Sequence, residues 1–246
     1  MTYCVGIRVT EGLVMLADTR TNAGVDNISR YRKLFTWQVQ GERAIAIMTA
    51  GNLSVTQGIV SRLSSQIARA EDDPGLECIL NAESVFRVAE LVGEAMRAMQ
   101  VRHRDALVAH RVAADASIIV GGQRQGGRHR LFLVYSAGNF IEATDDTPFL
   151  QIGEHQYGKP ILDRVIVPAT PLAEAVKAAL VSMDSTLRSN LSVGMPLDLA
   201  VLPAGTYRFA LERRIEANDP EFAVLSSGWS EALRAAFVHL PALQGV

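Results

Sequence analysis

The sequence lacks the residues and segments that mark several common classes of protein. Its 246 residues include two cysteines, Cys4 and Cys78, which form neither a Cys-x-x-Cys pair nor a disulfide framework. A reducing, cytoplasmic environment is therefore expected. The first residues show no basic stretch followed by an apolar one, and no run approaches about eighteen apolar residues. We expect neither a secretory signal nor a membrane-spanning helix.

The chain also lacks an excess of positive charge. Its formal net charge is −2, and no long basic run is present, which argues against binding of nucleic acid. Hydrophobic residues make up 48% and charged residues 20%, the balance of an ordinary globular protein. No internal repeat, low-complexity segment or linker divides the chain. We expect one domain spanning residues 1–246.

Several signatures of catalysis and of cofactor binding are missing as well. No Gly-x-Ser-x-Gly elbow is present. The glycine-rich segment 121–127 lies between two predicted strands rather than before a helix, so it predicts a hairpin loop and not a phosphate cradle. We expect neither a metal nor an organic cofactor. Five histidines show no metal-ligand spacing: His103, His110, His129, His155 and His239.

Two hairpins are predicted in the first fifty residues. Segments 2–9 and 13–17 are apolar and rich in β-branched residues, and a tight turn separates them. Segments 33–39 and 43–49 repeat the arrangement. The strands are too uniformly apolar for a sheet with one wet face, so both faces should be buried. The polar stretch between the hairpins, residues 19–32, predicts a loop.

After residue 51 the apolar period changes from strands to helices and back. Asn52 or Ser54 can cap a helix in which Val55, Ile59 and Leu63 recur every four residues, and segment 71–75 ends it. The alternation predicts an α+β fold with two packed sheets and helices outside them. Further helices are predicted at 83–103, 171–187 and from 226, and further strands at 116–120, 130–135, 139–143, 197–202 and 207–214.

Four residues at the ends of the first strands form a possible catalytic group. Removal of Met1 would give Thr2 a hydroxyl nucleophile and a free α-amine, whose reference pKa of about 8 suits a general base. Lys33 can stabilise the alkoxide, Asp18 can keep that lysine charged, and the N–H of Gly51 can bind an oxyanion. Antiparallel pairing should bring these strand ends to one edge of a sheet.

Each of these residues also has an ordinary structural interpretation. A threonine after the initiator methionine is commonplace, and Asp18 before a polar loop is typical of a turn. Lys33 at the start of a strand can be a solvated charge, and Gly51 can simply precede a helix. Cys4, on the same face of its strand as Thr2, is interpreted as a packing residue. The combination of the four residues is specific only because the segments that carry them match a known family in order and nearly in spacing.

The segments 2–9, 11–26, 32–35 and 44–51 carry a family resemblance. Thr2-Tyr3-Cys4-Val5-Gly6-Ile7, followed by Asp18-Thr19-Arg20-Thr21-Asn22-Ala23-Gly24-Val25-Asp26, resembles Anbu, the bacterial "ancestral β-subunit" family of proteasome-like N-terminal nucleophile hydrolases. The resemblance implies a four-layer αββα sandwich of two antiparallel sheets flanked by helices, with a C-terminal extension from about residue 208. It also implies a self-assembling ring or open helix, and leaves any unfoldase partner unknown.

The same resemblance assigns roles to individual residues. Thr2 is implied as the nucleophile, Asp18 and Lys33 as the charged pair, and Gly51 as the oxyanion donor. The residues implied to line the pocket for the substrate side chain are Thr21, Thr49 and Leu53.

The resemblance fades after Leu53, and two supporting positions depart from the family pattern. Glu154 stands where active proteasome subunits carry a serine, and Ser189 replaces an aspartate, whereas Ser192 matches the family. Glu154 is interpreted either as a charged loop residue or as a carboxylate that serves the site from another direction. The orienting network around the amine is therefore expected to differ.

Three functions remain open from the sequence. The first is an N-terminal threonine peptidase or amidohydrolase that works through an acyl-enzyme on Thr2. The second uses the same residues on a narrow substrate, such as a small conjugate or a peptide tag. The third is a non-catalytic or latent scaffold, which a retained Met1 would favour.

Overall fold

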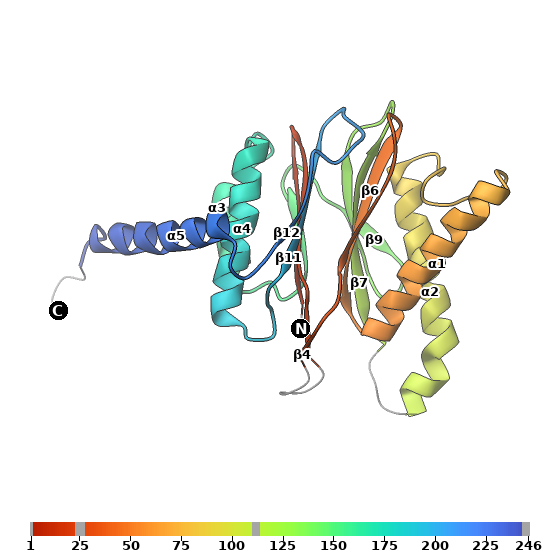
Figure 1. Cartoon of the computed structure of the whole chain (residues 1–246), viewed down its shortest axis with the longest axis horizontal. Coiled ribbons are helices and arrows are strands. Elements are labelled where there is room, and N and C mark those ends of the chain that lie inside the picture. Colours follow the sequence, from red (N-terminus) through yellow and green to blue (C-terminus); the bar gives the residue numbers. More distant parts are fainter. Residues whose placement is uncertain (1, 23–27, 110–113, 243–246) are drawn as a thin grey trace.

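Two five-stranded antiparallel sheets lie face to face at the centre of the molecule (Figure 1). This computed structural model describes residues 2–22, 28–109 and 114–242. The first sheet has the order β10 (Phe149–Gly153), β1 (Tyr3–Val9), β2 (Gly12–Asp18), β11 (Leu197–Pro203), β12 (Leu211–Ile215). The second has the order β5 (Leu34–Val39), β6 (Arg43–Gly51), β7 (Ala116–Arg124), β8 (Arg130–Val134), β9 (Phe140–Glu142).

Helices cover the outer face of each sheet (Figure 1). Helices α1 (Leu53–Asp72) and α2 (Val85–Ala109) pack on the second sheet, whereas α3 (Lys159–Val165) and α4 (Leu172–Ser189) cover the first. Helix α5 (Pro220–Val238) projects away from the body, and none of its residues is buried. The predicted sandwich of helix, sheet, sheet and helix layers is confirmed.

Apolar side chains fill all three spaces between these layers. Ile47 and Leu63 belong to the cluster between the second sheet and its helices, and Tyr3 belongs to the cluster between the first sheet and α4. Cys4 and Met48 lie in the central cluster between the two sheets. Strands β1 and β2 are therefore buried on both faces, which confirms the interpretation of their uniform apolarity.

The two predicted hairpins form, but they belong to different sheets. Residues of β1 pair with β2 in one sheet, and β5 pairs with β6 in the other. The expectation that antiparallel neighbours would bring all the strand ends to one edge of a single sheet is wrong. The ends meet because the two sheets stack, so the corresponding ends of β1, β2, β5 and β6 face one another across the sandwich.

The segment predicted as a loop, residues 19–32, contains a small separate ladder. Strands β3 (Arg20–Asn22) and β4 (Ile28–Arg30) pair only with each other. Three-residue strands are too short for a period of two to be recognised in the sequence. Residues 23–27, which carry part of the family resemblance, and Met1 lie outside the described residues.

The glycine-rich segment 121–127 is also not a simple loop. Strand β7 continues to Arg124, so Gly121 and Gly122 lie inside the sheet. A Cβ on Gly122 would lie 2.6 Å from the backbone oxygen of Ala44. These glycines permit a close approach of neighbouring atoms, a role that Gly in strands often has.

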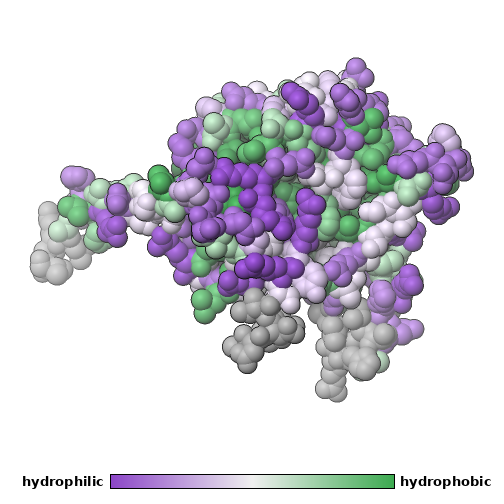
Figure 2. Space-filling view, in the orientation of Figure 1, coloured by the Kyte–Doolittle hydropathy of each residue, from purple (hydrophilic) through white to green (hydrophobic). Residues whose placement is uncertain are grey.

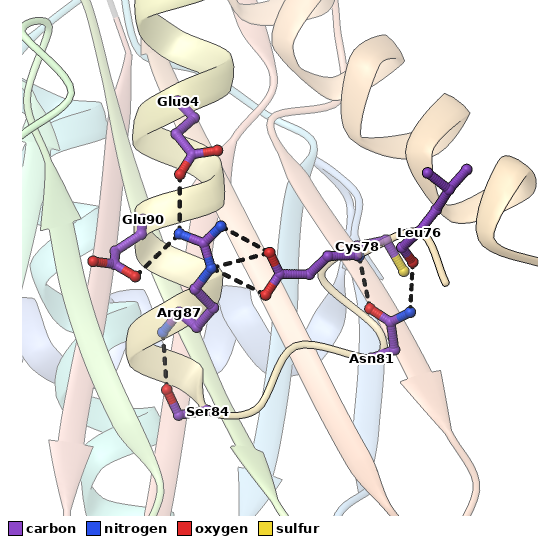
Figure 3. Close-up of polar contacts among 8 residues, drawn as sticks. Leu76, Cys78, Asn81, Ser84, Arg87, Glu90 and Glu94 are labelled. Atoms are coloured by element: carbon purple, nitrogen blue, oxygen red, sulfur yellow. Dashed lines mark hydrogen bonds and ion pairs between the residues drawn. The ribbon is translucent and has the colours of Figure 1, made fainter. Parts of the chain in front are cut away.

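Polar side chains stabilise the starts of the two helices that cover the second sheet. The Oδ1 atom of Asn52 accepts hydrogen bonds from the N–H groups of Ser54 (3.0 Å) and Val55 (3.4 Å), so Asn52 is the N-cap of α1. Arg87, near the start of α2, binds Glu77 of the preceding loop. Figure 3 shows that Glu90 and Glu94 also meet this guanidinium. Helix α2 runs six residues beyond the predicted end.

The last third of the chain differs most from prediction. Strand β10 and helix α3 were not predicted. Pro171 is the N-cap of α4 rather than a residue of its first turn. Helix α5 begins at Pro220, capped by Asp219, six residues before the predicted start. Strand β12 begins at Leu211 rather than at Tyr207.

The layered core predicts a contrast between two isoleucines of the second sheet. Ile47 is fully buried, whereas Ile141 is 46% exposed. Ile47→Ala should lower the free energy of unfolding by about 2–5 kcal/mol, since it leaves a cavity. Ile141→Ala should cost less than about 1 kcal/mol. Denaturant unfolding followed by circular dichroism measures both, and equal losses would contradict this assignment of the core.

Candidate active site

Thr2 lies at the start of the first sheet and is held through its backbone. Its carbonyl oxygen accepts a hydrogen bond of 2.6 Å from the N–H of Glu154. The N–H of Tyr3 donates to Asp18 Oδ1 at 3.0 Å. Both polar groups of the Thr2–Tyr3 peptide bond are therefore fixed. Gly153 has φ +81°, and a Cβ there would lie 2.0 Å from the Thr2 carbonyl oxygen, so this approach requires a glycine.

A buried ion pair lies beside Thr2. Lys33 Nζ is 2.7 Å from Asp18 Oδ1 and donates a second bond of 2.6 Å to the backbone oxygen of Arg20. Asp18 is fully buried and Lys33 is 4% exposed. The other oxygen of Asp18 accepts from the N–H groups of Arg20 (3.2 Å) and Gly194 (3.1 Å). Asp18 thus binds β1, β3, the residue before β5 and the turn before β11.

The electrostatics of this pair follow from its burial. Burial raises the pKa of the Asp18 carboxyl, and the Lys33 ammonium with the N–H groups of Tyr3 and Gly194 opposes that rise. Burial also raises the pKa of the Cys4 thiol, and Cys4 Sγ lies 3.8 Å from the backbone oxygen of Thr49. A thiol with a raised pKa is a poor nucleophile, which agrees with a packing role for Cys4.

A pocket of about 260 Å³ opens beside Thr2 between the ends of the two sheets. It brings together six of the ten residues singled out in the sequence. They come from the start of β1, from β3, from the residue before β5, from the end of β6 and from the first turn of α1: Thr2, Thr21, Lys33, Thr49, Gly51 and Leu53. Ala50, Thr56 and Gly153 complete the lining. Asp18 lies behind Lys33, outside the lining.

Gly51 ends β6 in a conformation that favours glycine. Its φ is +110°, and a Cβ would lie 2.2 Å from the backbone oxygen of Asp115. The next residue, Asn52, donates its N–H to that same oxygen at 2.8 Å and caps α1. The chain therefore turns sharply at the rim of the pocket, where the backbone of Gly51 is exposed.

The three remaining predicted residues lie outside this lining. The Glu154 carboxylate accepts from the N–H groups of His155 (2.8 Å) and Gln156 (2.7 Å) and from Asn190 Nδ2 (2.8 Å). Burial opposes its ionisation, but these hydrogen bonds outweigh that effect and hold the pKa of Glu154 below its usual range. Ser192 lies in the turn before β11, and Ser189, at the end of α4, is exposed.

The sequence did not identify the residues that support Thr2 from the helix side. The Tyr3 hydroxyl is 2.6 Å from Ser182 Oγ of α4 and accepts from Gln151 Nε2 at 2.7 Å. Burial raises the pKa of Tyr3 to about 12. Asn190 joins Glu154 to the next turn, since its Oδ1 accepts from the N–H of Ser192 at 2.9 Å. The sequence did contain one signal for this support: Ser182 is a polar residue within the apolar pattern of its helix.

A larger cleft, of about 460 Å³, opens between β5 and the edge strand β12. It contains none of the predicted site residues. Figure 2 shows hydrophilic residues gathered over β11 and β12 on this face. Arg214 forms a two-pronged ion pair with Asp198, and Arg213 pairs with Asp219. These two ion pairs of the cleft join β12 to β11 and to the start of α5.

Two negative findings apply to residues 2–22, 28–109 and 114–242. No group of three or more His, Cys, Asp or Glu side chains there could hold a metal ion. None of the described helices is long and apolar enough to cross a membrane.

The chain matches a known protein family and several solved structures. The family model described as Proteasome subunit matches residues 2–202. The solved structure of Anbu (ancestral beta-subunit) from Yersinia bercovieri is 45% identical, covers 98% of both chains and superposes with a TM-score of 0.90. The chain belongs to the Anbu family of proteasome subunits. No match is found among curated protein sequences.

Two further Anbu structures agree closely with the chain. An Anbu (Gly-1) mutant from Hyphomicrobium sp. strain MC1 is 48% identical, with a TM-score of 0.90 and coverage of 99% of this chain and 100% of its own. The structure named Helical Assembly of the Anbu Complex from Pseudomonas aeruginosa is 43% identical, with a TM-score of 0.92 and coverage of 99% and 98%. These Anbu matches extend past residue 202, where the proteasome model ends, and the predicted family resemblance is confirmed.

The buried pair predicts an asymmetric response to substitution. Lys33→Met leaves the Asp18 charge buried without its ammonium partner, so it should lower the free energy of unfolding by about 3–5 kcal/mol. The double variant Asp18→Asn/Lys33→Met removes both charges and should regain at least half of that loss. Denaturant unfolding of the two variants and the wild type tests this, and a double variant less stable than Lys33→Met would contradict it.

Glu154 predicts a pH-dependent contribution to stability. Its pKa is lower in the folded protein, so it contributes stability above the unfolded value of about 4.3 and loses it as the pH falls through the folded value. Glu154→Gln should therefore lose about 1 kcal/mol near neutral pH. The difference from wild type should shrink below about pH 4. Unfolding at several pH values tests this, and a difference that grew with acidity would exclude it.

Proposed function

We propose that this chain is an N-terminal threonine hydrolase that cleaves peptide or amide bonds through an acyl-enzyme on Thr2. The observation that carries the proposal is the setting of Thr2. The peptide bond between Thr2 and Tyr3 is hydrogen-bonded at both its N–H and its carbonyl oxygen. Thr2 also lines the same pocket as Lys33 and Gly51. Membership of the proteasome-subunit family supports this reading. Removal of Met1 by an aminopeptidase supplies the free α-amine.

The residues then divide the chemistry among themselves. The Thr2 hydroxyl attacks the substrate carbonyl and passes its proton to its own α-amine. The N–H of Gly51 receives the oxyanion, and the Lys33 ammonium stabilises the negative charge that develops on the attacking oxygen. Asp18 holds that ammonium in place. The leaving amine takes the proton as the C–N bond breaks, and water then hydrolyses the ester on Thr2.

The pocket indicates the kind of side chain that precedes the scissile bond. Thr21, Thr49 and Thr56 contribute hydroxyls or methyl groups, and Leu53 contributes an apolar surface. With a volume of about 260 Å³, no acidic side chain in its lining and the Lys33 ammonium already paired with Asp18, the pocket suits a small or medium neutral side chain.

A narrow amidohydrolase is favoured over a general protease by two positions. Ser189 is exposed at the end of α4, and the Glu154 carboxylate is bound to the backbone and to Asn190. Both positions depart from the pattern of active proteasome subunits, so the hydrogen-bond network that orients the amine is expected to differ here. A homo-oligomer, formed as a ring or an open helix, would further restrict access to the pocket, and the relative from Pseudomonas aeruginosa is described as a helical assembly.

Labelling with electrophiles tests the nucleophile and the free amine together. A β-lactone needs only the hydroxyl, whereas an epoxyketone needs both the hydroxyl and the free α-amine. Both should label the protein isolated from its host, and intact mass should place the adduct on a chain that begins at Thr2. Thr2→Ala should abolish labelling, and Thr2→Ser should retain it.

Thr10→Ala is the matched control, since Thr10 is an exposed threonine at the other end of β1. It should label like wild type. Equal labelling of Thr2→Ala would falsify the proposal. Labelling by the β-lactone alone would show that the α-amine is blocked. If intact mass then showed that Met1 is retained, the latent or scaffold function would replace the proposed hydrolase.

A further inference from the structure

A groove of about 500 Å³ runs along the outer surface between α1 and α2. The two helices lie side by side on the outer face of the second sheet (Figure 1). Gly58 of α1 lets them approach closely, because a Cβ there would lie 2.7 Å from Met99 Sδ of α2. The small side chains of Ser61 and Ser65 keep the groove open above that contact.

The groove is lined by positive charge without any negative charge. Arg62 and Arg69 are seven residues apart, so they project from one side of α1, and Arg102 faces them from α2. No acidic side chain lines the groove. Within the described part of the chain, none of the three guanidinium groups has a hydrogen bond or an ion pair. This holds although Glu71 and Asp105 lie on the same two helices.

The arginines of the groove differ in this respect from several other arginines of the chain, which pair with acidic side chains. Arg87, further along α2, contacts three carboxylates (Figure 3). Arg130 pairs with Glu142, and Arg214 pairs with Asp198. Arg69 near the end of α1 also has a simpler reason to be basic, since it interacts with the helix dipole. That reason does not apply to Arg62 or Arg102.

We propose that this groove binds an acidic, extended peptide segment of a partner protein. From Gly58 to Arg69, α1 rises about 16 Å, which matches about five residues of extended chain. Carboxylates spaced along such a segment can meet the three guanidinium groups, which favour planar, two-pronged recognition of carboxylates. The acidic cluster around Arg87 is already paired within the chain, which argues against a second copy using that cluster as the occupant.

The test uses the full-length assembly and a fluorescein-labelled peptide rich in Glu, Asp and Leu. The control peptide carries Gln and Asn in place of the acidic residues. Fluorescence anisotropy should show binding of the acidic peptide only, and the affinity should fall as salt rises. The Thr2→Ala variant should bind the acidic peptide as well as wild type does, which separates this groove from the pocket at Thr2.

Charge reversal within the groove gives the decisive comparison. Arg62→Glu/Arg69→Glu/Arg102→Glu should weaken binding of the acidic peptide on the order of tenfold or more. The matched control, Arg128→Glu/Arg164→Glu/Arg208→Glu, reverses three exposed arginines elsewhere on the surface and should bind like wild type.

Four outcomes would overturn the proposal. The first is equal binding of the acidic and the control peptide, and the second is an equal loss of affinity in the two triple variants. The third is tighter binding of a single-stranded oligonucleotide than of the acidic peptide. The fourth is a groove variant whose assembly mass, measured by light scattering without peptide, differs from that of wild type and of the control. That result would assign the groove to a contact between copies.

Discussion

The ion pair between Lys33 and Asp18 is the interaction on which the arrangement at Thr2 depends. Two charges in a dry interior are costly unless each is paired and the remaining hydrogen-bonding atoms are satisfied. Asp18 meets this condition by accepting bonds from Lys33, Tyr3, Arg20 and Gly194. Satisfying the charge therefore also fixes the positions of four separate chain segments.

The stacking of two sheets explains why these segments meet at all. Asp18 ends β2 in the first sheet, and Lys33 directly precedes β5 in the second. A single sheet could not surround a substrate, because its strand ends form a line. Two stacked sheets place their ends around a space, and the first turn of α1 closes one side of it with Leu53 and Thr56.

Part of this arrangement was predictable because the apolar period is clear where strands and helices are long, as in the first fifty residues and in α1. Apolar strands followed by apolar residues at every fourth position predicted the two hairpins and α1. The family resemblance of the segments that carry Thr2, Asp18, Lys33 and Gly51 predicted the group beside the pocket. Sequence period cannot tell which hairpins share a sheet, since strands buried on both faces look alike. It also cannot show where Gly122 meets the backbone of Ala44, because close approach has no periodic signature.

The orientation of single polar side chains was likewise beyond the sequence. Glu154 follows a glycine in the left-handed region, and its carboxylate folds back onto the next two N–H groups. Such a turn depends on the backbone path, which the residue identities do not specify. The partners of Tyr3 on β10 and α4 are more than a hundred residues away in the chain. No local pattern could predict them.

The sharp turn from β6 into α1 has an electrostatic consequence for the pocket. Helix α1 begins at Leu53, so its first turn, with the partial positive charge of an aligned row of peptide dipoles, lies at the rim. That charge amounts to about half an elementary charge and does not depend on any ionisable group. Negative charge on a bound carbonyl oxygen is therefore favoured by the fold itself, at every pH at which the protein remains folded.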